Sequence, residues 1–245
     1  MPLASPEQRR CHRLPVNKIG YLHVIFLPKR SSNLMIRATV CLSVLLSNLL
    51  LGLPAAAAES IYTDVDLDHC QTLDKPAPGE PGDYISMKCK GYRNYPLYFK
   101  ESDLRQSVFY GFLDKEIIDG ASESFGPFNH IGKKVEWRLD DTGKPYAAIL
   151  RFHIENSNPE TGMPDKQSAG QVLVISRVGQ PDDRRGCVVG YVDALANPDP
   201  NQRARQVADD MAVGFVCGRD EAVFHGTKGK KAGETSRYFP GAEAR

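Results

Sequence analysis

Apolar and polar residues alternate along several short segments of the chain, which is the pattern of half-buried β-strands. In residues 84–90, Ile85, Met87 and Cys89 share one face, and the polar residues between them share the other. Residues 134–139 repeat the alternation. We predict further strands at 97–101, 106–111, 146–155, 171–178 and 187–194, the last two apolar enough to be central.

One segment changes to the period of a helix. Its apolar residues recur at positions i, i+3, i+4, i+7 and i+8: Ala204, Val207, Ala208, Met211 and Ala212. Asp199 is expected to cap this helix, with Pro200 in the first turn and Gln202 completing a capping box. Gly214 is expected to end it.

A run of antiparallel strands followed by one helix predicts an α+β fold. We expect a mainly antiparallel sheet of about six or seven strands, with one C-terminal helix packed on it, in a single domain at 59–218. Polar loops at 112–133, 156–170 and 179–186 separate the strands. Residues 219–245 carry Lys228, Lys230, Lys231 and several glycines without periodicity, so we predict a flexible tail there.

The segment before the predicted domain has the features of a secretory signal peptide at 35–58. Arg37 precedes an apolar stretch at 38–53, and four alanines follow Pro54, so cleavage is expected after Ala58. Residues 1–34 are interpreted as a leader that is untranslated or removed, with translation starting at Met35. A retained membrane anchor is the alternative, because 38–58 could just span a bilayer.

Charge and composition bear on which partners the protein can have. The whole chain has a formal net charge of +1, with 41% apolar and 25% charged residues. Seven of the 31 basic and one of the 30 acidic residues precede Glu59, so the remainder carries a net charge of −5. We therefore expect neither nucleic acid nor, after signal cleavage, a membrane as a partner.

Four cysteines remain after the predicted cleavage, and an even number in an exported chain indicates disulfides. Four cysteines allow three pairings. A helix returning along strand 187–194 would place Cys217 beside Cys187, because about 14 helical residues cover the length of six or seven strand steps. Cys70 and Cys89 then pair by elimination.

No metal or cofactor is expected. Asp64, Asp66 and Asp68 could begin a calcium loop, but His69 stands where glycine is needed and Lys75 where a bidentate glutamate belongs. We interpret the three carboxylates as the solvent face of an N-terminal strand. Zinc spacing, phosphate-binding glycine loops and a dinucleotide-binding fingerprint are also absent from the sequence.

Candidate catalytic residues are few. His130 and His153 are the candidates for a general base in the core region, and a histidine on a sheet surface is more often structural. The glycine- and serine-containing stretch at 120–126 lacks the G-x-S-x-G spacing of a reactive serine. No catalytic residue is therefore assigned.

The most binding-like cluster is Tyr92, Arg93 and Tyr95 in the first hairpin, because tyrosine and arginine are enriched at interfaces. Gly91 and Pro96 bracket a turn that looks too irregular for a two-residue loop and would push these side chains outward. We expect any partner to contact this cluster. The alternative is that the tyrosines cover the edge of the sheet.

Seven segments, in order, resemble a group of exported proteobacterial proteins without assigned activity: YTDVDLDHC, KCKGYRNYPLYFKESDLR, FNHIGKKVEWRLD, AAILRF, VLVISRV, GCVVGYVDALAN and ARQVADDMAVGFVCGRD. The resemblance covers residues 61–220 and implies one exported domain. It brings no catalytic residue, cofactor or ligand.

These observations predict a periplasmic or secreted, non-enzymatic binding module whose partner is an envelope protein or a glycan. One alternative is an envelope hydrolase that uses His130 or His153 with a nearby carboxylate. Another is a proteinaceous inhibitor of a wall-degrading enzyme, suggested by size, disulfides and compartment alone.

Overall fold

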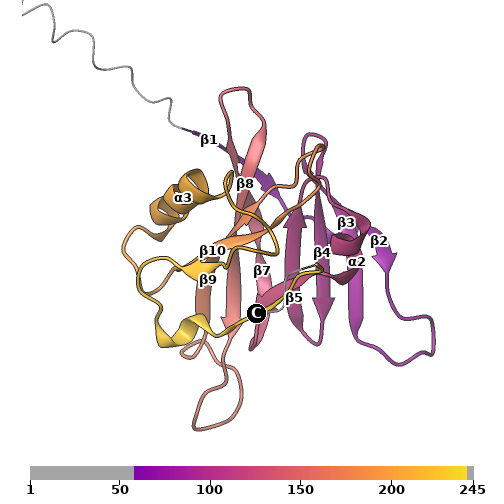
Figure 1. The fold of residues 1–245 in the computed structure, drawn as a ribbon. Helices are drawn as coiled ribbons and strands as arrows, with labels where there is room; N and C mark the ends of the chain where they lie inside the picture. The colour runs from indigo at the N-terminus through magenta and orange to yellow at the C-terminus, as the bar shows by residue number, and fades with distance from the viewer. Residues whose placement is uncertain (1–57, 242–245) are drawn as a thin grey trace, which may run out of the picture. The chain divides into compact units, whose positions relative to one another are not determined.

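The computed structural model describes residues 58–241 (Figure 1). The predicted leader and the predicted signal peptide up to residue 57 lie outside these residues. Within the described part, the chain forms twelve strands in three sheets and two α-helices. The expected α+β character is therefore confirmed, but the expectation of one sheet with six or seven strands and one helix is wrong.

The largest sheet has six strands in the order β1-β7-β8-β9-β10-β11. Its neighbours are antiparallel, except that β11 runs parallel to β10. The strands are β1 (Glu59–Asp64), β7 (Phe128–Leu139), β8 (Pro145–Glu155), β9 (Gly170–Arg177), β10 (Cys187–Asp193) and β11 (Val223–Phe224).

A four-stranded antiparallel sheet packs on one face of the large sheet. Its strands, in spatial order, are β2 (Gln71–Asp74), β3 (Tyr84–Tyr92), β4 (Tyr95–Ser102) and β5 (Arg105–Tyr110). The predicted alternation is confirmed, because Met87 and Cys89 of β3 enter the shared core together with Trp137 of β7. Trp137 is completely buried there.

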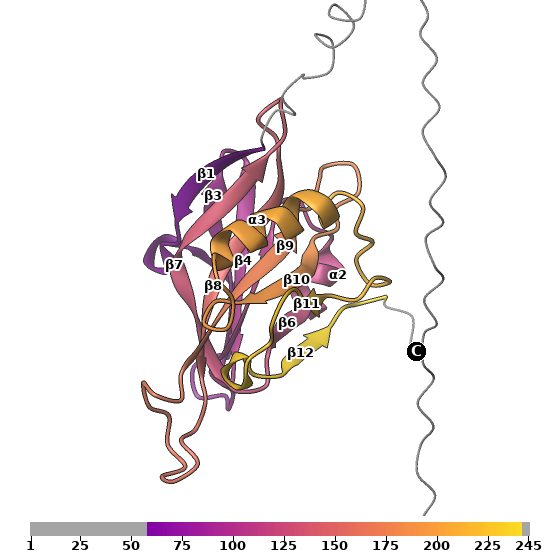
Figure 2. The ribbon, with the colours of Figure 1, turned by 90° about the vertical axis from the view of Figure 1, so that its left-hand side faces the viewer.

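The helix α3 (Pro200–Met211) packs on the opposite face of the large sheet (Figure 2). The predicted apolar stripe is confirmed, since Ala204, Val207 and Ala208 are buried. Pro200 occupies the first turn as predicted, but capping by Asp199 is wrong: its φ is 47° and its side chain makes no capping hydrogen bond. The left-handed backbone does not aim the carboxylate at the free N–H groups, and the helix ends at Met211 rather than at Gly214.

The third sheet pairs β6 (Ser122–Phe125) with β12 (Thr235–Tyr238), as Figure 2 shows. The predicted loop at 112–133 is therefore wrong, because it contains α2 (Lys115–Gly120), β6 and the start of β7. The predicted loop at 179–186 is confirmed. Two short 3₁₀ helices, η1 (Leu67–His69) and η2 (Lys230–Ala232), complete the described elements.

The C-terminal segment is not the flexible tail predicted from its composition. Up to Gly241 it supplies β11, η2 and β12, and it buries Ala232 and Phe239 in the two cores. Both strands pair with elements far earlier in the chain. Contacts with other parts of the chain therefore position a segment whose sequence has no clear strand or helix periodicity.

The disulfide pairing agrees with the prediction. Cys70 bonds Cys89 with a Cα–Cα distance of 4.4 Å, and Cys187 bonds Cys217 at 5.7 Å. Cys187 begins β10 and Cys217 follows α3, so the returning helix brings them together as expected. Among the described helices, none is long and apolar enough to cross a membrane.

Candidate ligand-binding cavity

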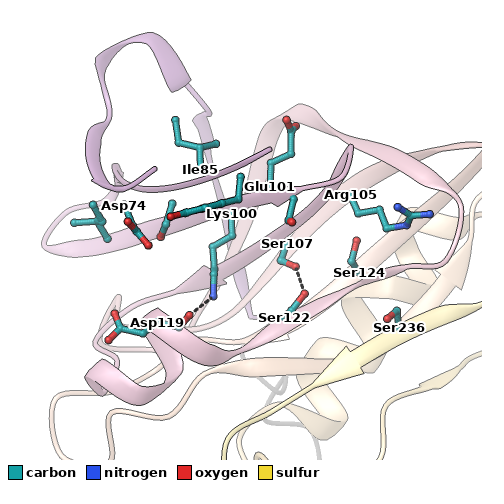
Figure 3. Close-up of a pocket in the computed structure, with 14 residues that line it drawn as sticks. Asp74, Ile85, Lys100, Glu101, Arg105, Ser107, Asp119, Ser122, Ser124 and Ser236 are labelled. Carbon is teal, nitrogen blue, oxygen red and sulfur yellow. Dashed lines mark hydrogen bonds between the residues drawn. The ribbon is translucent and has the colours of Figure 1, made fainter. Parts of the chain in front are cut away.

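A cavity of about 350 Å³ lies between the outer face of the four-stranded sheet and the segments α2, β6 and β12 (Figure 3). We call it the Ser–Lys cavity, because its polar lining includes one lysine and six serines: Lys100, Ser86, Ser102, Ser107, Ser122, Ser124 and Ser236. These residues come from five strands, so the cavity forms only when two of the sheets come together.

Four of the lining residues form one row across the four-stranded sheet. Asp74 is paired with Ser86, Ser86 with Lys100, and Lys100 with Ser107. Neighbouring strands lie roughly 4.8 Å apart, so the sheet brings a carboxylate, two hydroxyls and the lysine side chain onto one line, and the ammonium group extends from this line toward the end of α2. Such a row is a fixed series of hydrogen-bonding groups.

The row is polar because the strands alternate. Met87 and Cys89 of β3 point into the core, so Ser86 is on the outer face. Further along the outer face, Tyr98 and Phe109 are buried in the second hydrophobic cluster together with residues of α2. The outer face is therefore apolar where α2 covers it and polar where the cavity lies.

Lys100 joins this row to the end of α2. Its Nζ donates to the carbonyl oxygen of Asp119 at 3.0 Å and to that of Ala121 at 2.6 Å. A cation suits the carbonyl groups at a helix C-terminus. Burial lowers the pKa of Lys100, and the nearby charge of Asp119 opposes this effect. An ammonium group has three donors, so one remains for a ligand.

The serines next to Lys100 are held by hydrogen bonds. Ser107 Oγ lies 3.3 Å from Ser122 Oγ and accepts the backbone N–H of Glu123 at 3.1 Å. Ser124 Oγ donates to the carbonyl oxygen of Gln106 at 2.8 Å. By contrast, the side chain of Ser86 makes no hydrogen bond to another described residue, although Ser86 is only 9% exposed.

Three apolar residues line the cavity: Ile85, which also packs against the core, and the more exposed pair Leu73 of β2 and Tyr84 of β3. The last two form its rim. They are 40% and 42% exposed, which is high for residues of their kind. The loop before β3 comes close to one edge of the Tyr84 ring: a Cβ added to Gly82 would lie 3.3 Å from a ring carbon. The cavity thus combines a polar floor with an apolar, aromatic rim.

The predicted histidines do not line this cavity. His130 of β7 and His153 of β8 are register partners, and their rings stack with centroids 4.9 Å apart. His130 Nδ1 lies 2.9 Å from Glu155 Oε1. Burial, followed by the charges of His130 and Arg151, lowers the pKa of His153. Within the described residues, no serine, threonine or cysteine side chain hydrogen-bonds to either ring, so a nucleophile–base pair is not assembled there.

The predicted partner-contact cluster is not a set of outward-pointing side chains. Tyr92 pairs with Tyr95, so the hairpin has a two-residue loop and the longer turn expected from the sequence is wrong; the irregularity lies instead in the strand pairing, which shifts register between Cys89 and Tyr92. Tyr95 is only 8% exposed and donates its hydroxyl to Gln180 Oε1 at 3.2 Å. It is therefore a core residue.

The other two residues of the hairpin cover the core. The half-buried Tyr92 ring lies 6.1 Å from the Trp137 ring, centroid to centroid. Arg93 is exposed, lies 5.0 Å above the Tyr92 ring and donates to the carbonyl oxygen of Gly143 at 3.2 Å. The alternative that the tyrosines cover the sheet fits this geometry.

The three alternate aspartates do not share the face of a strand, because β1 ends at Asp64. Asp64 accepts a hydrogen bond from Lys134 Nζ at 2.6 Å, and Asp66 lies 2.7 Å from His69 Nδ1. In the described part of the chain, no group of three or more His, Cys, Asp or Glu side chains is placed to hold a metal ion.

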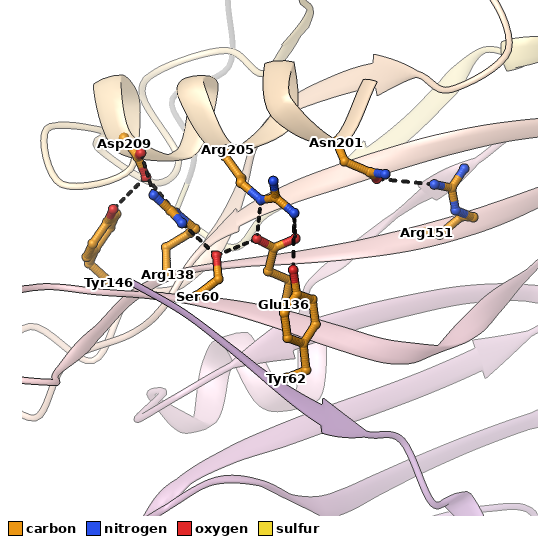
Figure 4. A network of polar contacts seen from close by, with 9 residues as sticks. All are labelled: Ser60, Tyr62, Glu136, Arg138, Tyr146, Arg151, Asn201, Arg205 and Asp209. Carbon is orange, nitrogen blue, oxygen red and sulfur yellow. Dashed lines mark hydrogen bonds and ion pairs between the residues drawn. The ribbon is translucent and has the colours of Figure 1, made fainter. Parts of the chain in front are cut away.

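A second polar cluster lies between α3 and the large sheet (Figure 4). Arg138 donates two parallel hydrogen bonds to Asp209, at 2.8 and 2.7 Å, and the Tyr146 hydroxyl donates to the same carboxylate at 2.6 Å. Arg205 donates to Glu136 at 2.5 Å. Because these charges pair with one another, the cluster fixes the helix on the sheet and is not a candidate site.

The Ser–Lys cavity was not predicted from the sequence. Ser86, Lys100 and Ser107 occupy outward positions of alternating strands, where polar residues are normal. The available signal was the strand register, which would have aligned them in one row. Comparison with protein-family models, with curated proteins and with solved structures finds no match to this chain.

Proposed function

We propose that the protein is an exported, non-enzymatic binding module of the cell envelope and that its ligand binds in the Ser–Lys cavity. The single observation that supports this most is the row of hydrogen-bonding groups on the cavity floor. A pocket of a few hundred Å³ with a few converging polar groups has the size and lining of small-molecule sites.

The geometry favours binding over catalysis. The hydrogen bonds of Lys100 go to two carbonyl oxygens rather than to a serine, so the lysine is placed as a donor and not as a base. The stacked histidines lie on the other sheet, with no nucleophile bonded to them in the described part of the chain. A donor lysine and fixed hydroxyls suit recognition.

Export is supported by the signal-like segment together with the two disulfides. Disulfides persist in oxidising compartments and are rare in the cytosol. N-terminal analysis of the protein from its native source is expected to begin at Glu59. A chain that keeps Met35, found with free thiols, would contradict export.

The binding proposal is tested by filling the cavity. In Ser86→Leu, a larger apolar side chain enters the space above the sheet while the core-facing residues of β3 stay unchanged. The matched control is Ser157→Leu, at an exposed position outside the cavity. Both variants are compared with the wild-type chain after circular dichroism and melting show that they are folded.

The readout is isothermal titration calorimetry with a panel of soluble envelope components: neutral, anionic and cationic mono- and disaccharides, short wall peptides and free amino acids. We expect the wild type and Ser157→Leu to bind a member of the panel and Ser86→Leu to lose that binding by at least about tenfold. The proposal is overturned if nothing in the panel binds, or if Ser86→Leu binds as well as the control.

A further inference from the structure

We infer that the ligand of the Ser–Lys cavity is an uncharged pyranose saccharide. This inference rests on the proposed function, and it adds the chemical class of the ligand. Three features of the described residues support it: the compensation of charge around the cavity, the free hydrogen-bonding groups on the floor, and the apolar rim.

The charged groups around the cavity are largely compensated by the protein itself. Arg105 pairs with Asp103, and the Asp119 carboxylate pairs with Lys115. The ammonium group of Lys100 is held by two backbone carbonyls. Asp74, two strands away from Lys100 in the same row, has no ion pair with another described residue. Glu101, which also lines the cavity, accepts a hydrogen bond from Gln106 Nε2. The lining therefore carries charges of both signs side by side, and no cluster of one sign among the lining residues selects a charged ligand.

The free polar groups require a ligand with several donors and acceptors. The hydroxyls of Ser86 and Ser236 make no side-chain hydrogen bond to another described residue, and each can donate or accept. Asp74 offers only acceptors, and Lys100 offers only a donor. A molecule whose groups can both donate and accept, as sugar hydroxyls do, matches this mixture without carrying a charge.

The rim distinguishes a saccharide from other polyols and amides. A pyranose ring has hydroxyls around its edge and C–H groups on its faces, so it needs polar groups at the side and an apolar surface below or above. Tyr84 offers an exposed aromatic ring beside the polar row, and Leu73 extends the apolar surface. The negative face of an aromatic ring attracts the slightly positive C–H groups.

The position of Tyr84 fits this role. It is paired with Ser102 and lies two residues before Ser86 on β3, so both side chains are on the outer face of the sheet. Gly82, in the loop before β3, lies close to one edge of the ring, and the ring remains exposed enough to contact a ligand.

The test uses the full chain and three sets of probes: neutral mono- and disaccharides, including N-acetylglucosamine and its β-1,4 dimer; uronic acids; and free amino sugars. Titrations are run at low and high salt concentration. We expect a neutral probe to bind at least about tenfold more tightly than its charged counterparts. Its affinity should change by less than about twofold with salt, since screening affects charged ligands.

The variants separate stacking from overall damage. Tyr84→Ala is expected to weaken binding of the neutral probe about tenfold, whereas Tyr84→Phe should keep it, because stacking needs the ring and not the hydroxyl. Tyr62→Ala is the control, since Tyr62 is also exposed but lies on β1, outside the cavity.

The outcomes also separate this inference from the proposed function. If a charged sugar, a peptide or an amino acid binds best and Ser86→Leu abolishes its binding, the saccharide inference is wrong and the binding module stands. The saccharide inference is also wrong, and the binding module again stands, if Tyr84→Ala binds the neutral probe as the wild type does. If no probe binds and Ser86→Leu changes nothing, both fall.

Discussion

Arg237 of β12 donates a hydrogen bond from Nε to Glu123 Oε1 of β6 at 2.5 Å; the Glu123 side chain is completely buried and that of Arg237 is 22% exposed. The second carboxylate oxygen of Glu123 accepts the backbone N–H of Val188 at 2.6 Å. Arg237 also donates to the carbonyl oxygen of Asp220 at 3.1 Å. One buried carboxylate thus connects three strands, and it explains why the C-terminal segment is ordered.

Glu123 is predicted to make stability depend on pH. Burial raises the pKa of its carboxyl from 4.5 to about 7, although Arg237 and the Val188 N–H oppose the shift. Between these two pH values the folded state keeps a proton that the unfolded chain releases. The stabilisation from this group is therefore complete below pH 4.5 and falls as the pH rises to about 7, by up to roughly 3 kcal/mol.

The measurement is urea unfolding of the wild type and Glu123→Gln between pH 4.5 and 7. The free energy of unfolding of the wild type minus that of the variant should decrease as the pH rises. Glu160→Gln, at an exposed position, is the control for general charge effects. A difference that increases with pH would mean that Arg237 outweighs burial and that the carboxyl ionises readily in the folded state.

Asp209 is predicted to matter far more than its neighbour Asp210. The Arg138 side chain is only 7% exposed, so replacing Asp209 by Asn leaves a buried guanidinium without its counter-charge. We expect Asp209→Asn to lower the free energy of unfolding by about 2 to 4 kcal/mol, less than for a fully buried pair because Asp209 is 33% exposed. Asp210→Asn, on the same helix but exposed, should change it by less than about 0.5 kcal/mol.

Chemical denaturation of both variants checks this prediction. Equal effects at the two positions would show that the ion pair contributes nothing beyond helix charge. A third variant, Arg138→Met with Asp209→Asn, should recover part of the loss, because a buried pair replaced by apolar or neutral groups no longer leaves a lone charge.

The strands with clear alternation and the α3 stripe could be predicted, because their burial follows a fixed period. In β7, Val135 and Trp137 point into the core just as the pattern indicates. The helix α2 was missed since six residues hold too few turns to show a period. Likewise β12 has almost no apolar pattern, and its place depends on the Glu123–Arg237 pair, whose members lie 114 residues apart.

The candidate site could not be read from the sequence for a related reason. Ser86 and Ser107 become neighbours of Lys100 only through strand register, and the register depends on the hairpins and on a shift in the β3–β4 pairing between Cys89 and Tyr92. At the hairpin around Tyr92 the opposite happened: the sequence predicted outward-pointing contact residues, and the structure buries Tyr95 and half-buries Tyr92. Tyrosine and arginine beside a turn are typical of an interface, but here the Tyr92 ring packs against Trp137 and the Tyr95 ring against Phe112.

The hairpin residues are therefore predicted to affect stability rather than partner binding. Tyr92→Ala should lower the free energy of unfolding by about 1 to 2 kcal/mol, because the half-buried ring loses its contact with Trp137. Arg93→Ala, at an exposed position, should cost less than about 0.5 kcal/mol. Thermal unfolding of the two single variants checks this, and a Tyr92→Ala variant as stable as the wild type would make the tyrosine a candidate contact residue again.

The two disulfides are predicted to have separable effects. All four residues of β2 are exposed, so this edge strand is held by its pairing with β3 and by the Cys70–Cys89 bond just before it. β2 carries Leu73 and Asp74 of the cavity. Replacing Cys70 and Cys89 by alanine should therefore both destabilise the protein, by about 2 to 4 kcal/mol, and weaken ligand binding.

The matched variant removes the other bond. Cys187 and Cys217 are 1% and 5% exposed and lie in the second hydrophobic cluster, whose residues do not include the polar row of the cavity. Replacing both by alanine should lower the free energy of unfolding by about 2 to 4 kcal/mol as well, because the bond closes a loop between positions 30 residues apart. Affinity should stay unchanged at a temperature where this variant is folded. If both pairs of substitutions weaken binding equally, the loss reflects general loosening of the fold, and β2 has no special part in the cavity.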